Sequence, residues 1–204
     1  MKYILLIVIT FSLSSCSLFY KVAFGIKKPR MESYSSITEY AKTLNIEPSN
    51  LAFAKDSASQ MELHAIFKGT PEILIFNKSK IFLPYKSDSV SCNAPIDSFL
   101  KNICEIESSH ASFEREIDYT HLLSLLYDKN NILNDTTIDF IIFADFVKYF
   151  PKVNSSHIID WNREFNNHLG NCNAKIIYVN LDYLESWGMS KKSLPTLRLR
   201  QNKK

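Results

Sequence analysis

Cys92 is the side chain best placed for thiol chemistry in this sequence of 204 residues. It lies in the segment SCNAP, just before a helix that we expect to begin near Pro95, and the exposed amides and dipole of a helix start lower the pKa of a thiol. No histidine adjoins Cys92, and no second cysteine stands close enough in the sequence to act as a resolving thiol. We therefore favour a cysteine that only packs at the helix start. A thiol-dependent oxidoreductase that uses Cys92 is the alternative.

A second group of candidate residues, His157, Glu164 and His168, falls on one stripe of an expected helix. Imidazole and carboxylate groups are zinc ligands by type, but these residues spread over about 16 Å of helix axis, which is too far for one ion. Only Glu164 and His168, one turn apart, could share a site. We expect polar residues on a solvated face, and the sequence predicts no metal and no other cofactor.

Four aspartates, Asp139, Asp145, Asp160 and Asp182, flank the same region. Asp145 could be a buried acid with a raised pKa, or a residue of a loop or helix start. No paired carboxylate or Ser/His/Asp signature accompanies it, so we favour the second interpretation. The sequence therefore predicts no catalytic residue in this region.

The stretch from Thr136 to Asp182 is the centre of the expected fold. Its apolar runs Phe140–Phe143 and Ile176–Val179 are typical of buried strands, and a segment of helical period between them ends at Gly170. This order predicts a strand–helix–strand unit with parallel strands. The buried stripe of the helix is expected to hold Ile158, Trp161, Phe165 and Leu169.

The rest of the chain provides the elements that surround this unit. Ser36 is the expected cap of the first helix, and Met61 and Leu63 are expected to point inward from the second. EILIF and KIFLPY, joined by residues 77–80, predict a β-hairpin. The expected helices cover 36–44, 59–67, 95–103, 116–127 and part of 183–189, and the expected outer strands cover 51–54 and 193–200.

The first sixteen residues, MKYILLIVITFSLSSC, combine an early positive charge, a short apolar run and small residues before Cys16. The run is too short to span a bilayer comfortably and is typical of a secretory signal over residues 1–15. Its end resembles the lipobox of bacterial lipoproteins, which implies an acylated Cys16 anchored in membrane lipid. An ordinary secreted protein with an incidental cysteine is the alternative. Residues 16–35 are then expected to form the lipidated N-terminus and a tether.

The same resemblance bears on the compartment, because Ser17 follows the cysteine and no acid stands nearby. In lipoproteins this favours the outer membrane, facing the periplasm. Besides the acylated Cys16, three cysteines remain in the mature chain, so at least one of them cannot pair within it. A helix between Cys92 and Cys104 would hold them about 14 Å apart, so no disulfide between them is predicted.

Composition limits the possible partners. The 46% apolar and 22% charged residues are those of a soluble globular chain, and the four glycines form no phosphate-binding motif. Removal of the signal deletes Lys2 and no acid, so the net charge falls from +3 to +2, which argues against a nucleic-acid partner. The basic residues of 191–204 could touch anionic lipid, although a solvated tail is the commoner explanation.

Three segments resemble the thioredoxin family. FADFVKYF (143–150) matches the place of that family's tryptophan and Cys-x-x-Cys, and LPTL (194–197) and TPEILIF (70–76) both match its proline-led strand. The resemblance implies cis-prolines at Pro71 and Pro195, and an α/β fold over 36–204: a thioredoxin-like three-layer sandwich with a central mixed β-sheet. Elements of the family's second half precede those of the first. The sheet is therefore either rearranged or shared by two incomplete halves.

The loop of this resemblance lacks the atoms of a redox site. Val147 and Phe150 stand where the two cysteines should be, with Lys148 and Tyr149 between them, and thiol exchange needs a thiolate and a resolving thiol. Two aromatic rings and a lysine are instead expected to form a contact surface. The sequence thus predicts a lipid-anchored protein of the bacterial cell envelope. Its non-catalytic thioredoxin-like domain is expected to act as a binding or structural module. The expected partners are membrane lipid, through acylated Cys16, and another envelope protein.

Overall fold

A mixed sheet of five strands in the order β2–β6–β5–β3–β4 forms the centre of the protein. The structure is a computed structural model and describes residues 23–84, 99–100, 103, 116–127, 137–169 and 172–194. The strands of the sheet are β2 (Leu51–Phe53), β3 (Ile73–Asn77), β4 (Phe82–Leu83), β5 (Phe140–Phe146) and β6 (Ala174–Asn180). The expected α/β class with a mixed sheet is confirmed.

The predicted strand–helix–strand unit is present as β5, α7 (Pro151–His168) and β6. β5 and β6 are parallel, with Phe140 opposite Ala174 and Phe146 opposite Asn180. All seven residues of β5 are buried, because a central strand of such a sheet is covered on both faces. Pro151 opens the helix, where its missing N–H would have no partner in any case.

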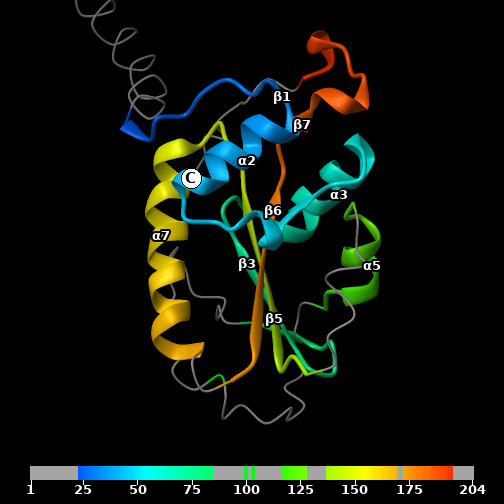
Figure 1. Cartoon of the computed structure of the whole chain (residues 1–204). Helices are drawn as coiled ribbons and strands as arrows, with labels where there is room; N and C mark the ends of the chain where they lie inside the picture. The colour runs from blue at the N-terminus through cyan, green and yellow to red at the C-terminus, as the bar shows by residue number, and fades with distance from the viewer. Residues whose placement is uncertain are drawn as a thin grey trace, which may run out of the picture.

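Helices cover both faces of the sheet, so the domain has three layers (Figure 1). On one face α2 (Tyr34–Thr43) and α7 bury Ile37, Ile158 and Trp161 against the sheet. On the other face α3 (Ser57–Phe67) and α5 (Tyr119–Ser124) bury a second cluster. That cluster includes Leu63, Phe67, Leu122, Leu126, Phe76 and Phe143.

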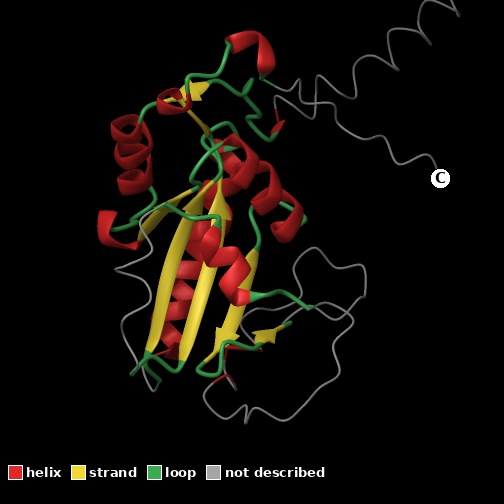
Figure 2. Ribbon diagram, turned by 90° about the vertical axis from the view of Figure 1, so that its right-hand side faces the viewer, coloured by secondary structure: helices red, strands yellow, loops and turns green. Residues whose placement is uncertain are grey.

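The predicted hairpin is also present, and it lies beside the central unit (Figure 2). β3 pairs antiparallel with β4, with Phe76 opposite Phe82, and antiparallel with β5, with Leu74 opposite Phe143. The peptide bond between Thr70 and Pro71, just before β3, is cis. Pro195, the second proline marked by the resemblance, lies outside the described residues.

Part of the expected tether belongs to the folded domain instead. β1 (Met31–Glu32) pairs in parallel with β7 (Tyr183–Leu184), and Glu32 is buried. Residues 23–30 lead into β1. Within them, the backbone amide of Lys27 donates a hydrogen bond to the carbonyl of Tyr149 at 2.8 Å. The domain therefore begins before residue 36, where the sequence places its boundary.

Several expected details differ in the structure. Ser33, not Ser36, caps α2, because its side chain accepts from the amide of Ser36. Met61 is 69% exposed on the outer side of α3. α5 is shorter than expected because Asp118 caps it, and residues 183–189 begin as strand β7 before the 3-10 helix η4 (Glu185–Trp187). The expected helix over 95–103 lies almost wholly outside the described residues.

Candidate functional site at the carboxyl ends of the parallel strands

Polar side chains gather where β5 and β6 end and β3 begins, which is the edge at which α/β sheets bind ligands. The loop 147–150 joins β5 to α7 at this edge. Its Val147 and Tyr149 are buried, at 0% and 8% exposure, and the Tyr149 ring packs edge-on against Phe150 with centroids 4.8 Å apart. The expected contact surface of two aromatic rings and a lysine is therefore wrong for Tyr149. The side chains of Val147 and Tyr149 fill the core instead of facing solvent.

Asp145 is a buried acid, contrary to the favoured interpretation of the sequence. It lies in β5 with no exposed surface, its carboxyl oxygen Oδ2 is 2.7 Å from the hydroxyl of Thr70, and the other oxygen accepts from the amide of Glu72. Burial raises the pKa of Asp145 to about 8, and these hydrogen bonds lower it by less. At neutral pH the carboxyl therefore keeps its proton, and it ties the segment before β3 to the end of β5.

Asp182 is a second buried acid that ties segments together, at the end of the neighbouring strand β6. It follows β6, is 2% exposed, and accepts from the amide of Lys148 at 2.7 Å and from the side chain of Asn180 at 2.8 Å. Burial raises the pKa of Asp182 to about 6 against those two hydrogen bonds. The side chain thus fixes the backbone of the 147–150 loop to the end of β6.

Lys148 connects the loop to the N-terminal part of the domain. Its Nζ lies 2.8 Å from Oε2 of Glu32 and also donates to the hydroxyl of Ser36, which in turn donates to Glu32 at 2.6 Å. Arg30 binds the other carboxyl oxygen of Glu32 at 2.5 Å. Burial alone would raise the pKa of Glu32, but the hydrogen bonds from Lys148, Ser36 and Arg30 outweigh it and lower the pKa.

Asn154, near the start of α7, binds the 147–150 loop through its side chain. It is fully buried, and its amide nitrogen donates to the carbonyl of Val147 and, at 3.3 Å, to the hydroxyl of Tyr40. Its side-chain oxygen has no hydrogen-bond partner. The amide therefore holds the loop against α2 and α7 at the cost of one unsatisfied acceptor.

Residues 23–30, which we call the strap, lie across the same edge of the sheet. Besides the bond from Lys27 to Tyr149, the ammonium of Lys152 donates to the carbonyl of Ala23 at 3.3 Å. Gly25 has φ +62, and a side chain there would come within 2.9 Å of Lys152. The strap thus covers the loop 147–150 at the carboxyl end of β5.

The described residues place no thiol at this edge. Cys172 precedes β6 and lies at the opposite end of that strand, about 25 Å away along a seven-residue strand, and it is disulfide-bonded. Cys16, Cys92 and Cys104, including the expected lipidation site and the candidate reactive thiol, lie outside the described residues. The edge as described therefore offers carboxyl, ammonium, amide and hydroxyl groups, engaged with one another.

The zinc candidates of α7 are partly buried and do not lie on the solvated face that the sequence predicts, since the side chains of His168 and Glu164 are only 20% and 18% exposed. His168 lies 3.5 Å from Glu164 on α7, while the ring of His157 packs near that of Trp161, at 5.7 Å. Within the described ranges, no group of three His, Cys, Asp or Glu side chains could hold a metal ion. No helix in that part of the chain is long and apolar enough to cross a membrane.

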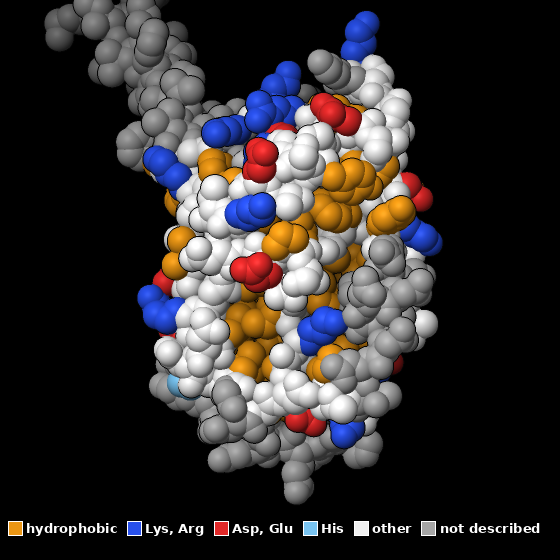
Figure 3. Space-filling view, viewed as in Figure 1, with side chains coloured by type: hydrophobic (Ala, Val, Ile, Leu, Met, Phe, Trp, Pro, Cys, Tyr) orange, Lys and Arg blue, Asp and Glu red, His pale blue; other side chains and the backbone are white. Residues whose placement is uncertain are grey.

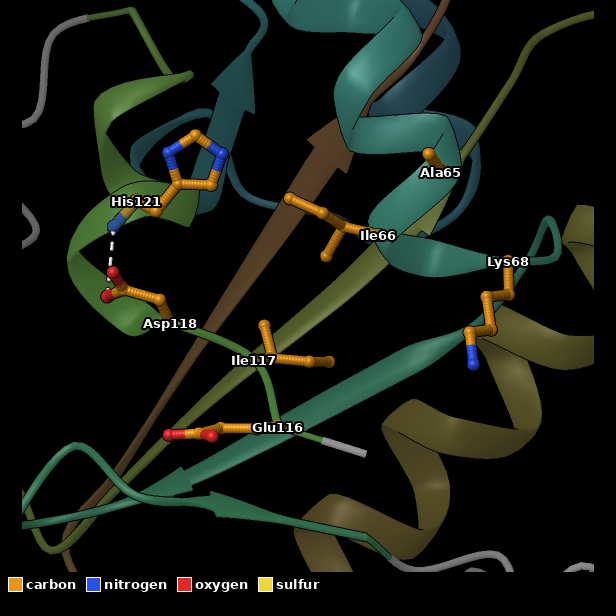
Figure 4. Close-up of a pocket in the computed structure, with 7 residues that line it drawn as sticks. All are labelled: Ala65, Ile66, Lys68, Glu116, Ile117, Asp118 and His121. Carbon is orange, nitrogen blue, oxygen red and sulfur yellow. Dashed lines mark hydrogen bonds between the residues drawn. The ribbon is translucent and has the colours of Figure 1, made fainter. Parts of the chain in front are cut away.

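A pocket of about 370 Å³ lies away from the loop, between α3 and α5 (Figure 4). Ile66 and Ile117 form its apolar floor, and Lys68, Asp118 and His121 stand on its rim. His121 is 2.7 Å from Glu62 of α3, so its ring already has an acidic neighbour. These side chains offer apolar contact and a few charges, without a convergent set of catalytic groups.

Sequence reasoning missed most of the network at the edge. Glu32, Ser36 and Asn154 come from segments that give no motif, and only the folded chain brings them together. Asn180 and Asp182 did carry a signal, because polar residues directly after a buried strand of a parallel unit lie at its carboxyl end. No family model matches the chain, and neither a curated protein nor a solved structure shows significant similarity to it.

Proposed function

We propose that the protein is a lipoprotein of the bacterial cell envelope, held in the outer membrane by acylated Cys16 and facing the periplasm. Its domain is a rearranged thioredoxin-like fold without thiol chemistry. It acts as a binding or structural module, with membrane lipid as one partner and another envelope protein as the second.

Support for the fold comes from the order of strands. The run β6–β5–β3–β4 combines a parallel strand–helix–strand unit with an antiparallel hairpin beside it, which is the arrangement that the family resemblance implies. The hairpin precedes the unit along the chain. One rearranged sheet is sufficient to account for this order, so a second incomplete half is unnecessary.

The main observation in favour of a loss of thiol chemistry is that side chains of the 147–150 loop pack into the core and the strap covers its backbone. Val147 is fully buried, Phe150 packs against the core beside it, and the strap binds the loop backbone through Lys27. A thiol pair acts only where a substrate disulfide can approach it. The loop has no thiol at residues 147 and 150, and the strap hinders the approach of a substrate disulfide, which supports the proposed loss of that reaction.

The compartment has independent support from Cys172. A disulfide at this residue persists in oxidising surroundings such as the periplasm and is rare in the cytosol. Together with the signal that ends before Cys16, this favours an exported protein.

The test of the anchor is mass spectrometry of the mature N-terminus from isolated membranes. We expect Cys16 as the first residue, carrying acyl chains, and loss of the modification in Cys16→Ser. A mature chain cut elsewhere, with no acyl group, would refute the anchor.

The test of the module is a pair of activity assays. Insulin reduction and peroxide reduction by the wild type should equal those of Cys92→Ser. A turnover that disappears in Cys92→Ser would instead favour the thiol-dependent oxidoreductase. Peptide mapping without reductant helps to decide between the module and the oxidoreductase. A disulfide between Cys92 and Cys172 would mean that Cys92 has no free thiol for catalysis.

A further inference from the structure

All charged residues between the expected anchor and β1 are basic. From Ser17 to Met31 the chain contains no acidic residue and four basic ones: Lys21, Lys27, Lys28 and Arg30. The last three belong to the strap, and their side chains are exposed. Basic residues beside a membrane anchor are attracted to anionic lipid, each with a strength of about 1 kcal/mol near the surface.

The structure holds this basic segment in one place on the domain. The Lys27 amide is bonded to Tyr149, and Lys152 of α7 binds the carbonyl of Ala23 and adds its own exposed charge to the strap. Several Lys and Arg side chains accordingly gather at the upper end of the molecule, with a few acidic side chains among and below them (Figure 3). The strap therefore presents a fixed basic surface and not a mobile run of charges.

The acids at this end weaken the positive surface only partly. Glu32 and Asp182 are 5% and 2% exposed and are bonded to basic or amide groups within the domain. The exposed acids of neighbouring elements are Glu39 of α2 and Glu185 of η4. Arg30 of the strap is itself bonded to Glu32 at 2.5 Å, so the exposed lysines Lys27, Lys28 and Lys152 carry most of the positive charge of this surface.

The length of chain outside the domain limits how far this surface can lie from a bilayer. Seven peptide links separate Cys16 from Ala23, and fully extended they span at most about 25 Å. Phe24, at the first described turn, is 44% exposed, and aromatic side chains prefer the membrane–water interface. An acyl chain at Cys16 therefore keeps the strap, and not the far end of the sheet, beside the leaflet.

We propose that the strap, together with Lys152, docks on an anionic phospholipid leaflet and sets the orientation of the domain on the membrane. The proposal rests on the acyl anchor proposed above. Phe24 enters the interface, the basic side chains meet lipid phosphates, and the turn between β3 and β4 points away from the bilayer. Lipid is favoured over an acidic protein because the short connection to Cys16 leaves the strap within reach of the headgroups.

Depth-dependent fluorescence quenching tests the docking on the full-length protein. The purified protein is reconstituted on vesicles of phosphatidylcholine, with or without 30% phosphatidylglycerol, and brominated phosphatidylcholine serves as the quencher. Phe24→Trp reports the strap, and Ile81→Trp, at a residue 46% exposed in the β3–β4 turn, is the matched control. Each spectrum is compared with that of the parent protein, which contains two tryptophans.

We expect the new tryptophan at position 24 to be quenched in vesicles with phosphatidylglycerol and released by high salt, and the one at position 81 to stay unquenched. Lys28→Gln should lower the ratio of docked to undocked protein by up to about fivefold. Lys78→Gln, an exposed lysine of the β3–β4 turn, should leave that ratio unchanged.

Flotation separates a failure of docking from a failure of the anchor. A protein that floats with both kinds of vesicle, but whose strap probe stays unquenched, overturns the docking and leaves the anchor intact. A protein that floats only with phosphatidylglycerol vesicles, with a quenched strap probe, keeps the docking and loses the anchor. A protein that floats with neither overturns both, and equal quenching of the two probes contradicts the proposed orientation.

Discussion

Replacing Asp145 with asparagine should make the stability of the protein less dependent on pH. The carboxyl is fully buried, and burial raises its pKa to about 8. An acid whose pKa is higher in the folded than in the unfolded state contributes stability at low pH, and that contribution is lost as the pH rises toward the folded pKa. Asparagine has nearly the same shape, and its NH2 group and carbonyl oxygen can take the places of the donor and acceptor oxygens of the protonated carboxyl.

The size of the effect follows from the two pKa values. With an unfolded value near 4 and a folded value of about 8, Asp145 lowers the free energy of unfolding by about 2 kcal/mol between pH 6 and pH 8. Asp182 acts with the same sign, but its pKa is raised only to about 6, so most of its effect lies at lower pH. The pKa of Glu32 is lowered, so its contribution is lost as the pH falls, below this window.

Urea unfolding at pH 6, 7 and 8, followed by tryptophan fluorescence, measures the difference. The wild type should lose about 2 kcal/mol over this range relative to Asp145→Asn. Asp160→Asn is the matched control, because Asp160 lies on the solvent face of α7 with its side chain 56% exposed, and it should follow the wild type. A wild type whose stability stays constant, or rises, relative to Asp145→Asn would refute the reasoning.

Two further substitutions test the contacts that close this edge of the sheet, and a third tests the disulfide at the opposite end of β6. Lys148→Met should lower the free energy of unfolding by about 2 kcal/mol in urea unfolding, because buried Glu32 then loses its ammonium partner and keeps only the bonds from Ser36 and from exposed Arg30; an unchanged value would contradict the network. Gly25→Ala should cost about 1 kcal/mol locally because of its positive φ, and should appear as faster amide exchange in the strap but not in β5. Cys172→Ser should cost about 3 kcal/mol in non-reducing urea unfolding, and reductant should abolish the difference from wild type.

The elements that the sequence predicts well are those with a strong local pattern. β5 and β6 are built on the apolar runs Phe140–Phe143 and Ile176–Val179, and the stripe of Ile158, Trp161 and Phe165 on α7 has the helical period, so burial alone determines their type. The hairpin likewise follows from two apolar runs around a short polar turn. In each of these segments the local preference agrees with the tertiary environment.

The elements that the sequence does not predict depend on contacts between distant segments. β1 has two residues and exists because Met31 and Glu32 meet Tyr183 and Leu184, more than a hundred residues later. The short stretch 31–35 has no apolar period, so its composition alone is typical of a tether. Only the acid at position 32 hints otherwise, since its partner Lys148 cannot be identified before the fold is known.

Asp145 illustrates why the candidate site was harder to predict than the fold. An aspartate after the run FIIFA is typical of a strand end, because an ionised carboxyl is costly to bury. β5 nevertheless continues through it to Phe146, since a raised pKa removes the charge and Thr70 and Glu72 complete its hydrogen bonds. The burial therefore depends on residues more than seventy positions away, which no local pattern contains.

The closed loop also limits where a module of this shape can bind a protein. Ligands of α/β domains usually enter at the carboxyl ends of the parallel strands, but here Tyr149 is buried and the strap crosses that edge. Docking of the strap on lipid would turn the same edge toward the bilayer. The α3–α5 side with its pocket, where Met61 of α3 is 69% exposed, and the turn that carries Ile81 would then stay accessible to a protein. The proposed protein partner should therefore bind the domain on one of these two surfaces, and not at the carboxyl ends of β5 and β6.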